Sequence, residues 1–224
     1  MPDVALAFDV NETLLDLKPL DAHFERIFGN ASLRPTWFAL MLQLSFGGIA
    51  TARYIDFPSA QRAAFEMLAE RSGITYDAED AGSLVDAMND LPPHPEVREA
   101  LQQLRDAGFQ MATLTNSPQD IVEAQLGNSG LRDVFDHVIS ADEVKRLKPA
   151  CEPYTFVAER LGSAIGSVRL IAAHWWDIDG ALAAGCKGAF VARPGAVLNP
   201  STPQPDIIGR DLTAVATRIL EHDA

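Results

Sequence analysis

The chain opens with an apolar run at residues 4–8 that has the length and composition of a buried parallel strand. Asp9 follows where this strand should end. A carboxylate at the carboxyl end of a parallel strand lies at the crevice where open α/β sheets bind ligands. Thr13 comes four residues later, close enough in a tight loop to hydrogen-bond that carboxylate. Asp9 is therefore either a functional acid or an ordinary helix-capping residue.

Between residues 18 and 91 the strand pattern stops and a helical period takes over, which predicts a helical insert after the first strand. The predicted helices cover residues 20–28, 37–46, 60–72 and 82–88. Their starts are marked by Asp21, Pro35 and Pro58, and their ends by Gly29, Gly47 and Gly73. The apolar face of this insert has two interpretations, an internal core and a dimer surface.

After a stiff Pro-rich hinge at residues 91–95, strands and helices alternate. Strands are predicted at residues 110–114, 134–139, 168–172, 188–191 and 206–209, and helices at 96–107, 119–128, 153–161, 178–184 and 212–220. This alternation predicts an α/β fold, a doubly wound parallel (Rossmann-like) sheet with an inserted α-helical cap domain. We expect residues 1–16 and 93–224 to form the core and residues 17–92 the cap.

The composition narrows the class of partner. With 18 basic and 31 acidic side chains the formal net charge is −13, a field that disfavours nucleic acid and anionic membrane surfaces. No signal peptide is apparent and the apolar stretch at residues 37–50 is too short to span a bilayer, so a cytoplasmic location is expected. Cys151 and Cys186 are too few for a disulfide framework or a zinc site and are expected to be reduced and buried.

Polar side chains follow three further predicted strands, and they are Thr115, Asn116, Lys148, His174 and Asp177. Because parallel strands end at the same edge of a sheet, we expect these groups to gather around Asp9. A lysine there would keep Asp9 ionised and offset the charge of an anionic substrate. Taken singly, Lys148 is more often a surface lysine and Asn116 a turn former, but their occurrence at successive strand ends favours a nucleophile site.

These residues form four motifs that resemble the haloacid dehalogenase superfamily of aspartate-nucleophile hydrolases, and within it the L-2-haloacid dehalogenase branch. The motifs, in chain order, are Asp9 with Thr13, Thr115-Asn116, Lys148-Pro149 with Tyr154, and Trp176-Asp177. The segment at residues 53–57, RYIDF, also resembles the dehalogenase cap. The resemblance covers nearly the whole chain.

The resemblance implies hydrolysis of short 2-haloalkanoic acids in two steps. Asp9 attacks C2 and forms an ester, and water activated by Asp177 then hydrolyses the ester. Lys148 and Thr13 hold the nucleophile, and His174 is a further catalytic candidate. The expected substrate-binding residues are Asn11, Thr115, Asn116, Tyr154, Trp37, Phe38 and Trp176. A small anionic substrate, a halide product, no metal or organic cofactor, and a homodimer through the cap are also implied.

Two positions separate this reaction from that of a Mg²⁺-dependent phosphatase. Such phosphatases usually carry a general acid two residues after the nucleophile, where this chain has Asn11, which has no acidic proton to donate. They also usually carry an acidic metal ligand five residues before Asp177, where this chain has Ala172. Asp16 or Asp179 would have to complete a metal site. A phosphatase of a small phosphorylated metabolite therefore remains the alternative, and a non-catalytic binding protein on the same fold is a second one.

The chain also departs from the dehalogenase pattern. The family's cap arginine should follow the cap tryptophan, but Trp37 is followed by Phe38, and Arg34 is the nearby candidate to replace that arginine. The family's Ser and Asn before the last motif are Ala172 and His174 here. His174 is either a partner of the hydrolytic water or a packed structural histidine. These changes bear on the identity of the substrate more than on the type of reaction.

Overall fold

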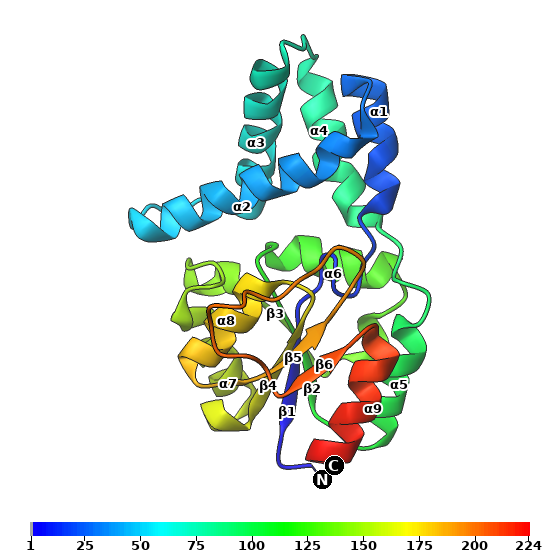
Figure 1. The fold of residues 1–224 in the computed structure, drawn as a ribbon, viewed down its shortest axis with the longest axis vertical. Coiled ribbons are helices and arrows are strands. Elements are labelled where there is room, and N and C mark those ends of the chain that lie inside the picture. Colours follow the sequence, from blue (N-terminus) through cyan, green and yellow to red (C-terminus); the bar gives the residue numbers. More distant parts are fainter. Residues whose placement is uncertain (1) are drawn as a thin grey trace.

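The computed structural model describes residues 2–224. One six-stranded sheet of parallel strands has the order β3-β2-β1-β4-β5-β6, with helices on both of its faces (Figure 1). The strands are β1 Ala5–Phe8, β2 Met111–Thr115, β3 His137–Ser140, β4 Val168–Ala172, β5 Lys187–Val191 and β6 Ile207–Gly209. The strand order reverses between β1 and β4, so the ligand crevice of such a sheet lies at the carboxyl end of β1. The predicted doubly wound α/β fold is confirmed.

Strand β1 is buried on both faces, as its continuous apolar sequence predicts. Leu6 and Phe8 join the hydrophobic cluster that includes α5 (Val97–Asp106), α6 (Gln119–Asn128) and α9 (Leu212–Asp223). Ala5 and Ala7 point to the opposite face, against α7 (Cys151–Leu161) and α8 (Trp175–Ala184). This two-sided packing fixes the position of Asp9, the next residue after the strand.

The helical cap lies between β1 and β2 in the sequence and stands above the carboxyl ends of the strands (Figure 1). Its helices are α1 Asp21–Phe28, α2 Arg34–Ala50, α3 Phe57–Ser72 and α4 Ala78–Ala87. Short 3₁₀ turns are η1 Lys18–Leu20, η2 Ala31–Leu33, η3 Met88–Asp90, η4 Arg132–Val134, η5 Ala141–Val144 and η6 Ile165–Ser167. The predicted helical insert is therefore confirmed.

The cap has an aromatic core of its own. Trp37 is fully buried, its ring lies 5.6 Å from that of Phe24, and its Nε1 donates to the carbonyl of Gln61. Phe28 packs edge-on against Phe65 at 5.3 Å. Buried aromatic pairs of this kind add to the free energy gained from burying apolar area. Much of the apolar face of the insert thus forms an internal core.

Two chain segments that run side by side join the cap to the core. Leu15 forms an antiparallel bridge with Pro93, and the Asp16 amide donates to the Pro92 carbonyl at 2.8 Å. The His94 amide donates to the carbonyl of Leu14 at 2.9 Å. The outgoing and returning segments are therefore tied together directly beside the loop that carries Asp9.

Three local predictions are wrong. Helix α2 does not end at Gly47 but continues to Ala50. Gly47 and Gly48 both lie within the helix, and the chain turns only at Ala52, where φ is +55°. Val134 belongs to a 3₁₀ turn and β3 begins at His137, so the strand predicted from residue 134 begins three residues later. Cys151 is exposed, although Cys186 is buried, and both are free thiols.

Across residues 2–224, every helix is too short or too polar to cross a bilayer.

Helix α8 packs closely against the loop after Lys148 at Gly180, and this contact can be tested by mutation. A Cβ at Gly180 would lie 2.6 Å from both Pro149 Cβ and the Tyr154 hydroxyl. Gly180→Ala should therefore lower the free energy of unfolding by about 1–3 kcal/mol, measured by urea denaturation. The matched control is Gly127→Ala, at an exposed glycine of α6 where an added Cβ would have no neighbour within 4 Å outside the helix backbone. This variant should raise the free energy of unfolding by about 0.5–1 kcal/mol. Equal stability of the two variants would contradict this packing.

Candidate active site

The loop after β1 presents a carboxylate in a fixed orientation. The Thr13 hydroxyl donates to Asp9 Oδ2 at 2.6 Å and accepts from the amide of Ala173 at 2.9 Å, which ties the loop to the end of β4. The amides of Leu14 and Leu15 both donate to the carbonyl of Val10. Asp9 therefore cannot rotate freely, and it is 5% exposed.

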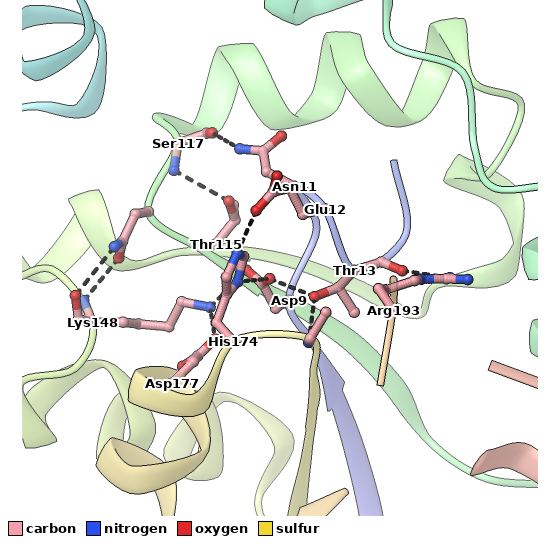
Figure 2. A network of polar contacts seen from close by, with 12 residues as sticks. Asp9, Asn11, Glu12, Thr13, Thr115, Ser117, Lys148, His174, Asp177 and Arg193 are labelled. Carbon is pink, nitrogen blue, oxygen red and sulfur yellow. Dashed lines mark hydrogen bonds and ion pairs between the residues drawn. The ribbon is translucent and has the colours of Figure 1, made fainter. Parts of the chain in front are cut away.

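The tight turn of this loop places Glu12 in the left-handed region, with φ of +61°, which is unusual for a residue with a side chain. The surrounding structure holds this conformation. His94 from the hinge contacts the Glu12 carbonyl at 3.1 Å, and an Arg193 nitrogen donates to the Thr13 carbonyl at 2.8 Å. The strained turn directs the Glu12 carboxylate toward His174 (Figure 2).

Lys148 lies between two carboxylates. Its Nζ is 2.9 Å from Asp9 Oδ1 and 2.5 Å from Asp177 Oδ2, and its side chain is fully buried (Figure 2). Asn116 fixes the lysine backbone, since its Oδ1 accepts from the Lys148 amide at 2.8 Å and its Nδ2 donates to the Lys148 carbonyl at 3.2 Å. Burial opposes the charge on Lys148, but the two carboxylates raise its pKa.

Asp177 is fully buried, and both of its oxygens are engaged. The Tyr154 hydroxyl donates to Oδ1 at 2.6 Å, and Lys148 donates to Oδ2. Burial raises the pKa of Asp177, against the attraction of Lys148, and burial beside Asp177 also raises the pKa of Tyr154 well above its usual value. Tyr154 lies behind Asp177 and orients it.

His174 contacts two further carboxylates. Its Nδ1 lies 3.1 Å from Asp9 Oδ2 and its Nε2 lies 3.0 Å from Glu12 Oε2. Both ring nitrogens face acceptors, so both carry protons and the ring is an imidazolium. Burial disfavours this charge, but the hydrogen bonds to Asp9 and Glu12 raise the pKa of His174 to about 10.

Burial also opposes the charge on Asp9, but Lys148 and His174 outweigh it and hold the pKa of Asp9 far below its usual range. The carboxylate of Asp9 is therefore ionised at neutral pH. Oδ1 has one hydrogen-bond partner and Oδ2 has two. An ionised, oriented carboxylate of this kind is suited to act as a nucleophile.

The site continues into the cap as a series of alternating charges. Glu12 Oε1 lies 3.3 Å from an Arg34 nitrogen, and Arg34 also pairs with Asp21 at 2.6 Å. The complete series, from core to cap, is Asp177, Lys148, Asp9, His174, Glu12, Arg34 and Asp21. Arg34 binds two carboxylates and does not line the cavity beside Asp9, which differs from the suggestion that it replaces the family's cap arginine.

A cavity of about 10 Å³ opens beside Asp9, which is room for one water molecule. Its lining residues are Asp9, Asn11, Phe38, Phe57, Thr115, Asn116, Lys148, His174 and Trp176. Phe38 and Trp176 both stack against the ring of His174, with ring centroids 5.7 and 5.1 Å away. Trp37 and Tyr154, expected to contact substrate, do not line it, because Trp37 is in the cap core and Tyr154 is behind Asp177.

Sequence reasoning missed Glu12 and Phe57 as site residues. Phe57 lies in the RYIDF segment that resembles the dehalogenase cap, so a signal for it was present. Glu12 stands inside the first motif, but nothing in the sequence indicates that the turn directs its side chain to His174, 162 residues away.

Asn11 belongs to a buried amide network. Its Nδ2 donates to the Ser117 hydroxyl at 3.3 Å, and its Oδ1 accepts from Gln125 at 3.1 Å. Gln125 is fully buried and also donates to the carbonyl of Met88 at 2.7 Å. The amide at this position is thus held in one orientation at the wall of the cavity.

The donor set does not fit Mg²⁺. Asp16 accepts from the Lys18 amide, and Asp179 binds Thr202, so neither is directed at Asp9. Asp177 is occupied by Lys148 and Tyr154. Within residues 2–224, no three His, Cys, Asp or Glu side chains are arranged to hold a metal ion.

Comparison with known proteins agrees with this geometry. The family model of the haloacid dehalogenase-like hydrolases matches residues 4–185. The chain belongs to this family. Among its relatives, an (S)-2-haloacid dehalogenase of Pseudomonas sp. (strain YL) is 28% identical, over 94% of this chain and 91% of that protein. The (S)-2-haloacid dehalogenase 1 of Pseudomonas sp. (strain CBS-3) is 31% identical, over 86% of each chain.

A solved structure extends this comparison to the fold of this haloacid dehalogenase-like hydrolase. The L-2-haloacid dehalogenase of Xanthobacter autotrophicus, with chloropropionic acid covalently bound, superposes with a TM-score of 0.91 and 26% identity, and the match covers 100% of both chains. The hydrolase therefore belongs to the L-2-haloacid dehalogenase branch of its family, as its motifs suggested.

The raised pKa of His174 makes a prediction for stability. A group whose folded pKa, about 10, lies above its ordinary value of 6.5 stabilises the fold fully below pH 6.5 and loses that effect as the pH rises through 10. The stability difference between the wild type and His174→Gln should therefore shrink from pH 6.5 to pH 10, by on the order of a few kcal/mol. Urea denaturation across this range measures it. A difference that does not change with pH would show that His174 is neutral.

Proposed function

We propose that this hydrolase cleaves the carbon–halogen bond of short 2-haloalkanoic acids through an ester on Asp9. The observation that carries the proposal is the state of Asp9, which is ionised, held between Lys148 and His174, and exposed only to a small cavity with aromatic walls. The substrate is a monoanion, and the two cations beside Asp9 offset its charge.

The wall of the cavity favours halide over an alkoxide as the leaving group. Halide leaves without a proton, whereas an alkoxide needs a general acid. The position two residues after Asp9 is Asn11, whose amide is bound to Ser117 and Gln125 and has no acidic proton. The donor set that does not fit Mg²⁺ also disfavours transfer of a phosphoryl group to an aspartate anion.

In the first step, Asp9 Oδ1 attacks C2 of the haloacid from the side opposite the halogen. The C2–O bond forms as the carbon–halogen bond breaks, and halide leaves with the electron pair. Thr13 and His174 hold Oδ2 and so keep Oδ1, with its single partner Lys148, directed at the cavity. Asn116 and Thr115 line the cavity where the substrate carboxylate or the halide would lie.

In the second step, we assign the activation of water to the His174–Glu12 pair. Asp177, expected from the resemblance to perform this role, has both oxygens bound and no exposed surface. His174 lines the cavity and contacts the carboxylate that becomes the ester. Once Asp9 is esterified, it no longer carries a charge, and one of the two interactions that hold the proton on His174 is lost.

The protons balance over this cycle. The imidazolium of His174 loses a proton to solvent after the ester forms, which is the one proton released in the overall reaction. Neutral His174, oriented by Glu12, then takes a proton from water as the water attacks the Asp9 carbonyl carbon. The leaving alkoxide takes that proton, and the new Asp9 carboxyl group returns its own proton to His174. The ionised Asp9 and the imidazolium are restored.

The relatives support this reaction class, since proteins similar to this chain carry the names (S)-2-haloacid dehalogenase and haloacetate dehalogenase. A cavity of about 10 Å³ walled by Phe38, Phe57 and Trp176 favours acids with two or three carbons and requires the cap to shift as the substrate binds.

A substrate screen tests the reaction class. The wild type should release halide from chloroacetate, bromoacetate and 2-chloropropionate in the presence of EDTA, and Asp9→Asn should lower this rate by at least about 10⁴-fold, since it removes the nucleophile. Asp16→Asn, in the same loop but turned away from the cavity, is the control and should retain activity. Activity only on p-nitrophenyl phosphate, lost with EDTA, would instead establish the phosphatase.

Intact-protein mass spectrometry tests which residue activates water. Glu12→Gln and His174→Gln should still react with bromoacetate but hydrolyse the ester about 10²–10⁴-fold more slowly, because they lack the base pair. The mass of the substrate minus halide should therefore accumulate on Asp9. If Glu12→Gln turns over normally while Asp177→Asn accumulates the ester, Asp177 is the base and our assignment is wrong.

A further inference from the structure

A second cavity, of about 70 Å³, lies at the seam between the cap and the core. Its cap side is formed by the end of α2 and the segment after it, including Arg53 and Tyr54, and its core side by residues 145–147. Three of the lining side chains are cationic, Arg53, Lys145 and Arg146, and none is acidic. No step of the proposed reaction uses this cavity.

The cap side depends on a reversal of the chain after α2. The Arg53 amide donates to the carbonyl of Gly48 at 2.9 Å, and a Cβ on Gly48 would lie 2.6 Å from the Arg53 carbonyl oxygen. Ala52 takes a left-handed conformation with φ of +55°. Only a glycine at position 48 allows so close a reversal, and it brings Arg53 back toward the core.

The core side meets the cap through Lys145. This residue follows η5 in a left-handed conformation with φ of +50°, and its Nζ lies 5.1 Å from the centre of the Tyr54 ring. Such a cation–π contact across the seam holds the lysine at the cavity. The cavity is thus formed by two turns of the backbone that meet at the seam.

The positive charge of this cavity contrasts with the acidic character of the whole chain, whose formal net charge is −13. Lys145 pairs with Asp142 and Arg146 pairs with Glu152, but neither acid lines the cavity. No carboxylate within residues 2–224 forms an ion pair with Arg53. The acidic surface of this protein repels small anions, but a local group of cations attracts them.

The cavity lies against the outside of the reaction site. Leu147, on its wall, directly precedes Lys148 in the chain. On the cap side, Phe46 follows the lining residue Ser45 and packs against Trp176 with ring centroids 5.4 Å apart. Trp176 in turn lines the cavity beside Asp9. The walls of the two cavities are thus linked through neighbouring residues, Leu147 with Lys148 and Ser45 with Phe46, which contacts Trp176.

We propose that this second cavity is a docking site for small monoanions, at which the substrate carboxylate binds before it reaches Lys148. The proposal rests on the proposed function for the identity of the anion, but the binding of an anion itself does not. Its volume, about 70 Å³ against about 10 Å³ for the cavity beside Asp9, gives room for a small carboxylate or a halide.

Kinetics at two ionic strengths test the docking step. Arg53→Glu combined with Lys145→Glu should lower kcat/KM for chloroacetate by about tenfold at low ionic strength, with kcat unchanged, and by less than about twofold in 0.5 M salt, where exposed charges are screened. Arg210→Glu combined with Arg218→Glu makes the same change in net charge at exposed positions outside this cavity and is the control. Equal losses in the two double variants would overturn the proposal.

A bromide soak of crystals tests anion binding without turnover. We expect an anomalous peak between Arg53 and Lys145 in the wild type that is absent in the Arg53→Glu, Lys145→Glu variant. Bromide in the cavity with no change in kcat/KM would identify an adventitious ion only, and no bromide would overturn the site. If the wild type releases no halide from any haloacid, the proposed function fails, and the bromide result alone decides whether the cavity binds anions.

Discussion

The site depends on one buried ammonium group that bridges two carboxylates. Lys148 Nζ, with no exposed surface, contacts Asp9 and Asp177, and each of these charges would be unstable in the interior without the others. Neighbouring elements support this arrangement at each point. Asn116 holds the lysine peptide, Tyr154 completes the contacts of Asp177, and the absence of a side chain at Gly180 lets α8 approach the loop after Lys148. Replacing Lys148 would leave both carboxylates buried without the cation between them, so the placement of the two acids depends on the lysine.

In the proposed mechanism, the same electrostatics that prepare Asp9 for the first step also set up the second. In the resting state, Lys148 and His174 keep Asp9 ionised, and Asp9 and Glu12 keep His174 protonated. When Asp9 becomes a neutral ester, the alternating series of charges is interrupted at its centre, and His174 can release its proton. Glu12 remains to orient the ring, and Arg34 on the cap remains to orient Glu12. In this proposal, formation of the ester on Asp9 controls when His174 becomes available as the base, without a second acidic group having to approach the ester.

Much of this fold could be predicted from the sequence, because strong apolar runs and clear end signals determine its elements. Strand β4 and helix α6 have the predicted bounds, 168–172 and 119–128. The gathering of His174 and Asp177 around Asp9 follows from the parallel strand topology, and Lys148 reaches the same edge through the loop after β3. Side-chain direction does not, since Trp37 and Tyr154 stand within the expected motifs but point into the cap core and behind Asp177. The contact of Glu12 with His174 depends on a left-handed turn at a residue with a side chain, which local propensity disfavours and only the folded surroundings maintain.

If Asp9 is the nucleophile, the oxygen added to the substrate comes from Asp9, and water replaces that oxygen on the enzyme. A single turnover in ¹⁸O-labelled water, with enzyme in excess over bromoacetate, tests this most directly. We predict that the first hydroxy acid released contains unlabelled oxygen and that the label appears in the peptide that contains Asp9. Labelled oxygen in the product of the first turnover, with an unlabelled Asp9 peptide, would show that water attacks the substrate directly and would contradict the account.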